Sequence, residues 1–343
     1  MEPDAYVSPA AAPKPARWLW RALLLLLLII VVGVLSLMWW WDVEPVSYDG
    51  VAASKASAQA RGERVVIGTV TSDALVQVSR LMLEKRGGYL ANDVLPPGVL
   101  MDNVPNWEFG VLVQCRDLAR ALRNGFSRSQ TQSVEDKSLR EAEPLFSFTN
   151  DRWMFPSSEG EYGDAIAHIE DYRTRLQDND NFNAQFYARA DNLADYLAVV
   201  ESRLGSLSQR LSASVGPSRV NTDLGNDGRA EQSKPAPDQG MVRTPWTEID
   251  DVFYEARGSS FALAQFLKAI DEDFAKVLED KNARISLQQI IRELEDAQKP
   301  VKSPMILNGS PFGFFANHSL VMANYISRAN AAVIDLRKLL ERG

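Results

Sequence analysis

The chain has 343 residues, of which 37 are basic and 45 are acidic, so its formal net charge is −8. This balance argues against nucleic acid as a partner and against tight docking on anionic lipid, because both require an excess of positive charge. The single cysteine, Cys115, excludes an intramolecular disulfide, so a buried core must stabilise the fold.

Residues 22–41 (ALLLLLLIIVVGVLSLMWWW) form the one long uncharged apolar run, which is long enough for one helix to cross a bilayer. Basic residues precede the run and acidic residues follow it: Lys14, Arg17 and Arg21, then Asp42 and Glu44. The positive-inside rule therefore predicts a short cytoplasmic N-terminus at residues 1–21 and an extracytoplasmic remainder. Most of the chain is therefore expected to lie outside the cytoplasm.

A cleaved signal peptide is the alternative interpretation of this run. Its apolar core exceeds the roughly 7–15 residues of a signal sequence, and no small-x-small cleavage site follows directly. Tryptophans at its exit, Trp39, Trp40 and Trp41, are typical of the aromatic belt at a membrane interface. We therefore expect an uncleaved single-pass anchor.

Residues 42–64 are small and polar, which predicts a flexible stem between the membrane and a first helical region at 65–215. In that region the spacing of apolar residues predicts a helix over 72–86, with Thr71 or Ser72 as its N-cap, and a second helix over about 105–125.

The second predicted helix carries the one basic cluster of interest. Arg116, Arg120 and Arg123 line up along one face, and Arg128 lies just beyond the helix. Arginines in this arrangement are candidates for binding an anionic group or an acidic partner. The more ordinary interpretation, which we favour, is that they pair with nearby acidic residues.

Three apolar seams alternate spacings of three and four residues, the pattern of helices that pack along their length. The first consists of Phe186, Ala190, Leu193, Leu197, Val200, Leu204, Leu207 and Leu211. The others consist of Leu263, Leu267, Ile270, Phe274 and Val277, and of Met322, Ile326, Ala329, Val333, Leu336 and Leu340. Three compatible seams favour an intramolecular bundle over an open coiled-coil dimer, so the predicted fold class is all-α.

Residues 216–245 are dense in Gly, Pro, Asn, Asp and Ser, which predicts a disordered loop within the bundle. A second helical region, 246–343, is expected to pack with the first. Before its last helix, residues 304–319 (PMILNGSPFGFFANHS) combine prolines, glycines and phenylalanines, a composition typical of an irregular binding surface. The candidate binding residues are Asn308, Phe312, Phe314, Phe315, Asn317 and His318.

Catalytic motifs are missing from the sequence. It contains no P-loop, H-E-x-x-H, C-x-x-C, G-x-S-x-G or S-x-x-K motif. Neither of the two histidines, His168 and His318, has a second imidazole at ligand spacing. We therefore assign no catalytic, metal-binding or cofactor-binding residue.

Several stretches closely resemble a bacterial family catalogued as domain of unknown function 2333. They include GGYLANDVLPPG, DNVPNWEFGVLVQCRDLARALR, FYARADNLADYLAVVESRLGSLSQRLSASVG and SPMILNGSPFGFFANHSLVMANYISRANAAVIDLR. The resemblance spans nearly the whole chain after the apolar run. It implies a single-pass inner-membrane protein of Gram-negative bacteria with a periplasmic helical domain and no assigned activity.

Two functions remain open on this sequence. The favoured one is a non-enzymatic interaction or scaffold component of the cell envelope, whose partner is another envelope protein or a second copy. The alternative is a binding protein or enzyme directed at lipid or cell wall, with a pocket near the basic helix face and the 308–318 loop. A deep pocket with convergent polar groups favours the alternative, whereas a filled core with an exposed apolar patch favours the first.

Overall fold

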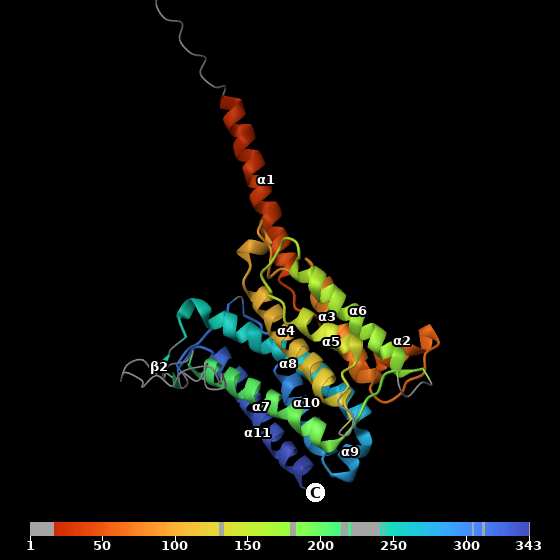
Figure 1. Cartoon of the computed structure of the whole chain (residues 1–343). Coiled ribbons are helices and arrows are strands. Elements are labelled where there is room, and N and C mark those ends of the chain that lie inside the picture. Colours follow the sequence, from red (N-terminus) through yellow and green to blue (C-terminus); the bar gives the residue numbers. More distant parts are fainter. Residues whose placement is uncertain are drawn as a thin grey trace, which may run out of the picture.

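In the computed structural model, a long N-terminal helix, α1 (Arg17–Trp41), projects from a bundle formed by the other helices (Figure 1). The structure describes residues 17–129, 134–178, 183–213, 219–220, 241–242, 244–303, 305–310 and 313–342. Within these ranges the fold is helical apart from one short strand pair, which confirms the predicted all-α class with an N-terminal membrane-span candidate.

The bundle contains long and short helices that follow one another along the chain. They are α2 (Gly50–Arg61), α3 (Thr69–Glu84), α4 (Asn103–Ala121), α5 (Lys137–Phe146), α6 (Ser158–Leu176), α7 (Ala190–Ala213), α8 (Ile249–Asp273), α9 (Ala275–Asp280), α10 (Arg284–Asp296) and α11 (His318–Glu341). A 3-10 turn, Gly98–Leu100, precedes α4, a π-turn, Leu122–Phe126, extends α4, and a 3-10 turn, Trp246–Glu248, precedes α8.

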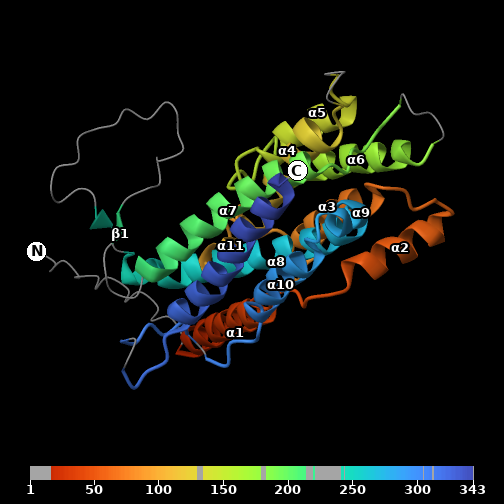
Figure 2. The ribbon, with the colours of Figure 1, turned by 90° about the horizontal axis from the view of Figure 1, so that it is seen from below.

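The predicted seams lie at the centre of this bundle. Helix α7 packs along α11, and the two lie side by side in Figures 1 and 2. Helix α8 packs against α3, α4, α10 and α11, and most of its residues are buried. Of the predicted seam residues, Phe186, Ala190 and Val277 are partly buried and all the others are buried. The core is therefore continuous from the first helical region to the second.

Helices α4 and α8 approach each other through two glycines. A Cβ atom at Gly110 would lie 2.1 Å from the Glu255 carbonyl oxygen, and one at Gly258 would lie 1.9 Å from the Trp107 carbonyl oxygen. Neither position has room for a side chain. The absence of a Cβ atom at both positions thus sets the distance between the two central helices.

Helix α3 begins at Thr69, two residues before the earlier of the two predicted caps. Its N-cap, Gly68, has no side chain to accept a hydrogen bond from the first turn. Asp273, at the end of α8, accepts hydrogen bonds from the Thr71 backbone N–H and hydroxyl, both at 2.7 Å. A carboxylate distant in sequence thus caps α3, so the helix does not need Thr71 or Ser72 in that role.

The structure corrects the expectation of a flexible stem over residues 42–64. Helix α2 lies in this segment, and Asp49 caps it by accepting a hydrogen bond from the Ala52 N–H at 3.0 Å. Ser54 and Ala58 are buried, and the helix contacts α3 and α8. A small, polar composition is therefore compatible here with a helix that packs through a narrow face.

Most of the predicted disordered loop, 216–245, lies outside the described residues. Within it the structure describes a short antiparallel pair, β1 (Arg219–Val220) with β2 (Met241–Val242), and residues 244–245. The pair lies beyond the end of α7, away from the contact between α4 and α8.

The buried cap of α3 predicts a pH dependence of stability. Burial raises the pKa of Asp273 to about 6 from 3.8, although the hydrogen bonds from Thr71 act in the opposite direction. The native state therefore holds this proton more tightly than the unfolded chain. The contribution of Asp273 to the free energy of unfolding should therefore fall as pH rises from about 4 to about 6, by roughly 3 kcal/mol at 1.36 kcal/mol per pKa unit.

The variant Asp273→Asn keeps an acceptor for Thr71 but has no proton to lose. Its stability relative to the natural chain should rise across the same pH window and level off above it. Chemical denaturation of both full-length proteins in detergent, followed by circular dichroism, measures this difference. If the difference in free energy of unfolding between the two proteins does not change with pH, Asp273 is not the group that titrates in this window.

Candidate functional site

The end of α1 is attached to the bundle by aromatic contacts. The Arg86 guanidinium carbon lies 4.3 Å from the centroid of the Trp40 ring, a cation–π contact. Trp41 packs on Gly87, where a Cβ atom would lie 2.8 Å from the indole. The last turn of α1 therefore packs on Arg86 and Gly87 where the helix joins the bundle.

Arg257 of α8 continues this attachment past the helix. Its Nε and Nη2 donate to the two carboxylate oxygens of Glu44 at 2.7 and 2.6 Å, a bidentate pair. Its Nη1 donates to the carbonyl oxygens of Ala297 (3.1 Å) and Lys299 (3.0 Å), at the end of α10. The guanidinium side chain is only 7% exposed. One arginine thus joins the segment after α1 to α8 and α10; we call these contacts of Trp40, Trp41 and Glu44 the anchor junction.

A buried ion pair holds the turn on which the anchor junction rests. Lys85 donates to Glu108, and both side chains are almost fully buried. Glu108 also accepts hydrogen bonds from the N–H groups of Leu90 (2.9 Å) and Ala91 (2.8 Å). Burial raises the pKa of Glu108 and lowers that of Lys85, and the opposite charge of each partner counteracts the shift. These bonds fix the chain between α3 and α4.

The arginines of the predicted basic face make contacts within the chain. Arg116 donates to the carbonyl oxygens of Phe146 (2.7 Å) and Phe148 (2.6 Å), at the end of α5. The other three arginines pair with acidic residues: Arg123 with Glu143 (2.9 Å) and Glu135 (3.1 Å), Arg120 with Glu143 (3.6 Å), and Arg128 with Glu135 (3.8 Å). These contacts join α4 to α5 and to the segment that precedes α5.

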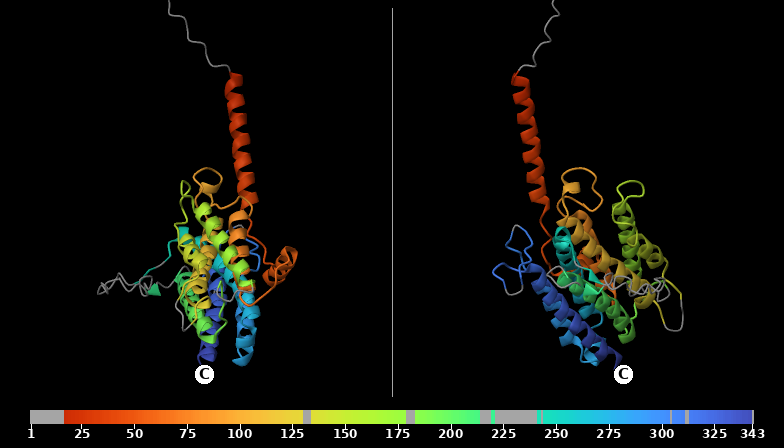
Figure 3. Two further views of the ribbon diagram at one scale, coloured as in Figure 1. Left: turned by 45° about the vertical axis from the view of Figure 1, so that its right-hand side comes forward. Right: turned by 90° about the vertical axis from the view of Figure 1, so that its left-hand side faces the viewer.

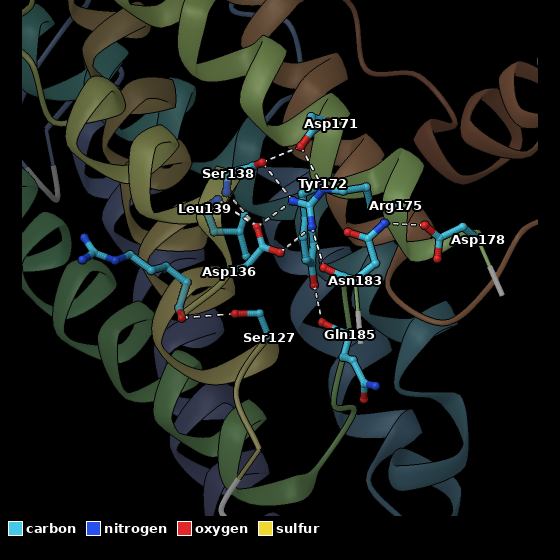
Figure 4. A network of polar contacts seen from close by, with 11 residues as sticks. Ser127, Asp136, Ser138, Leu139, Asp171, Tyr172, Arg175, Asp178, Asn183 and Gln185 are labelled. Atoms are coloured by element: carbon cyan, nitrogen blue, oxygen red, sulfur yellow. Dashed lines mark hydrogen bonds and ion pairs between the residues drawn. The ribbon is translucent and has the colours of Figure 1, made fainter. Parts of the chain in front are cut away.

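Arg175, near the end of α6, is the centre of a second arginine network (Figure 4). It donates twice to Asp136, both at 2.8 Å, and once each to Asp171 (2.9 Å), Ser138 (2.8 Å) and the Asn183 carbonyl oxygen (2.7 Å). These bonds use all five N–H donors of the guanidinium group. No donor remains for a ligand, so the network acts as a structural link between α5, α6 and the segment before α7.

The candidate binding loop separates into structural polar residues and exposed aromatic residues. Asn317 caps α11 by accepting a hydrogen bond from the Leu320 N–H at 2.9 Å, and His318 Nδ1 accepts one from the Leu307 N–H at 2.9 Å. Asn308 pairs with Asn317 in an isolated bridge. Phe314 is 99% exposed and Phe315 is 70% exposed. Phe312 lies outside the described residues.

A hollow of about 270 Å³ lies beside this loop, between α8, the end of α10 and the start of α11. Its wall includes Phe253, Tyr325 and His318, and its rim includes Lys299 and Lys302. Lys299 pairs with Asp296 at 2.8 Å, and Arg257, which also lines the hollow, is bound to Glu44. The hollow is slightly smaller than a typical ligand pocket, and most of its polar side chains already have partners.

Sequence reasoning did not identify Arg257, Arg175 or the Lys85–Glu108 pair. Arg257 interrupts a buried run of small and apolar residues, which was a usable signal that its charge has a partner. Arg175 and Asp171 are four residues apart on one helix, which indicates a local pair but not the contact with Asp136. Nothing local in the sequence connects Lys85 with Glu108.

No curated protein and no solved structure matches the chain. The model of a bacterial family, domain of unknown function 2333, described as an uncharacterized protein conserved in bacteria, matches residues 14–343. The match includes α1 and every described helix of the bundle. It confirms the resemblance found in the sequence: the chain belongs to this family.

Proposed function

We propose that the protein is a single-pass component of the bacterial cell envelope that acts through interactions rather than catalysis. In this proposal α1 spans the inner membrane, the N-terminus is cytoplasmic, and the bundle lies in the periplasm against the membrane surface. The observation that carries the proposal is the exposure of α1. The most apolar 18-residue window of its span Trp18–Trp41 has a mean hydropathy of 3.0, and none of that window is buried in the bundle. Lipid is the medium that would cover such a surface.

The anchor junction supports an anchor that is retained. A signal sequence is removed from the mature protein, whereas Trp40, Trp41 and Glu44 contact the bundle directly. Cleavage on either side of Glu44 would separate the bundle from at least part of these contacts. These contacts support a role for α1 and the segment after it in the folded protein.

A continuous buried core and an exposed apolar patch favour an interaction role over a ligand pocket. The patch consists of Met305, Phe314, Phe315, Leu320 and Val321, around the start of α11; we call it the aromatic patch. Exposed apolar groups of this kind mark protein-binding surfaces in soluble domains. In the adjacent hollow, Arg257, Lys299 and His318 are engaged within the chain, which leaves the lipid- or cell-wall-directed enzyme with less support.

The proposed orientation predicts which sites a membrane-impermeant maleimide reaches in cells with a permeabilised outer membrane. Ala60→Cys places a thiol on the exposed side of α2, and Ser8→Cys places one in the N-terminal segment. Cys115 is fully buried, and burial raises the pKa of its thiol to about 12, so the natural chain should stay unlabelled. We expect Ala60→Cys to react in these cells and Ser8→Cys to react only after lysis. The reverse pattern would overturn the orientation.

The aromatic patch predicts a site-specific protein contact. A photoreactive phenylalanine analogue at position 314 should give a crosslinked adduct in cells that express the full chain. The same analogue at Ile285, which is 79% exposed at the start of α10, provides a control of comparable exposure. Mass spectrometry of the adduct then identifies an envelope protein or a second copy. Equal crosslinking at both positions, or none at 314, would contradict the assignment of the patch.

A further inference from the structure

Two loops beside α1 expose large apolar side chains. The first loop, 94–100, carries exposed Val94, Leu95, Val99 and Leu100, and the second, 153–155, consists of exposed Trp153, Met154 and Phe155. Leu95 is 73% exposed and Phe155 is 95% exposed. Side chains of this size are normally turned inward, and here they form the tips of two adjacent loops.

Hydrogen bonds hold the bases of the two loops together. The Asn92 side-chain amide donates to the Arg152 carbonyl oxygen and to Glu159, both at 2.9 Å. The Tyr89 hydroxyl donates to the Asn150 carbonyl oxygen at 3.1 Å. Asn92 is buried, so these bonds are shielded from water. The two apolar tips are therefore presented together on a fixed support.

Both loops lie at the end of the bundle from which α1 emerges (Figures 1 and 3). Leu100 and Met101 share a small hollow with Met38 and Trp39, in the last turn of α1. Trp39 is one of the tryptophans expected at the membrane interface. The first loop thus lies at the level of the interface itself, and the second loop lies beside it.

We propose that loops 94–100 and 153–155 insert their apolar side chains into the leaflet through which α1 enters the periplasm. The proposal rests on α1 being a membrane span, as proposed above. At the level of Trp39 the surrounding medium is the boundary between headgroups and acyl chains, where Trp, Phe and Leu side chains partition favourably. Asp93 and Asp102 flank the first loop, so apolar insertion rather than attraction to anionic headgroups provides the contact.

This contact gives the bundle two attachments to one membrane. Helix α1 fixes the position of the bundle, and the loop tips prevent it from tilting or rotating about the anchor. The anchor junction transmits this constraint because Arg257 ties the chain after α1 to α8. The bundle would then present its other surfaces, including the aromatic patch, at a defined angle to the bilayer.

Depth-dependent quenching of site-specific labels tests the proposal. Full-length variants Leu95→Cys and Phe155→Cys are labelled with an environment-sensitive fluorophore and reconstituted into phosphatidylcholine vesicles. The vesicles contain lipids with a nitroxide near the headgroup end of the acyl chain. Ile285→Cys is the control of comparable exposure, because it lies at the start of α10, directly after α9, and α9 lies at the end of the bundle opposite α1 (Figure 1). Leu27→Cys in α1 reports whether the anchor itself is in the bilayer.

We expect the nitroxide lipids to reduce emission from Leu95→Cys and Phe155→Cys at least about twofold, and to leave Ile285→Cys unchanged. If Leu27→Cys is quenched while both loop labels behave like Ile285→Cys, the loop proposal is wrong and the anchor stands. If Leu27→Cys is also unquenched, the anchor itself is wrong. Because all four positions are exposed, the substitutions leave the core intact.

Discussion

The pair between Glu44 and Arg257 is the contact on which the attachment of the apolar helix α1 to the bundle depends. Glu44 follows the apolar helix by three positions, and Arg257 belongs to the central helix of the core. Loss of one partner would leave a nearly buried charge without compensation, a change that typically costs about 3–5 kcal/mol. Because Arg257 lies on α8 and also binds the carbonyl oxygens at the end of α10, it connects the chain after α1 to the core of the bundle.

Arginine is used for cohesion elsewhere in the bundle as well. Arg116 of α4 and Arg123 of the π-turn after it bind the region of α5. Arg175 uses all five of its N–H donors for hydrogen bonds within the chain. A protein without disulfides can gain rigidity in this way, since each guanidinium group joins several backbone segments at once. These arginines are occupied within the chain, whereas the aromatic patch and the two apolar loop tips are exposed to the surroundings.

Local patterns predicted much of this fold, and contacts between distant residues account for the rest. The apolar run of α1 and the seam residues Leu197, Leu267 and Leu336 repeat with the helical period, so neighbouring residues suffice to predict their burial. The cap of α3 by Asp273 joins residues about 200 positions apart, and no local pattern contains it. Helix α2 was not predicted, because its narrow buried face is formed only by contact with α3 and α8. In the candidate site, composition alone indicated Phe314 and Phe315 as candidates, and both are exposed.

A distance measurement between α1 and the far end of the bundle tests the rigid attachment most directly. Nitroxides at Leu35→Cys in α1 and Ile285→Cys beside α9, in the full-length protein in lipid, report this distance by pulsed electron paramagnetic resonance. We expect a single narrow distribution, which Arg257→Ala broadens and Arg140→Ala, a change in an exposed pair, leaves narrow. A broad distribution in the chain that retains Arg257 would show that the bundle swings freely on its anchor and would contradict this account.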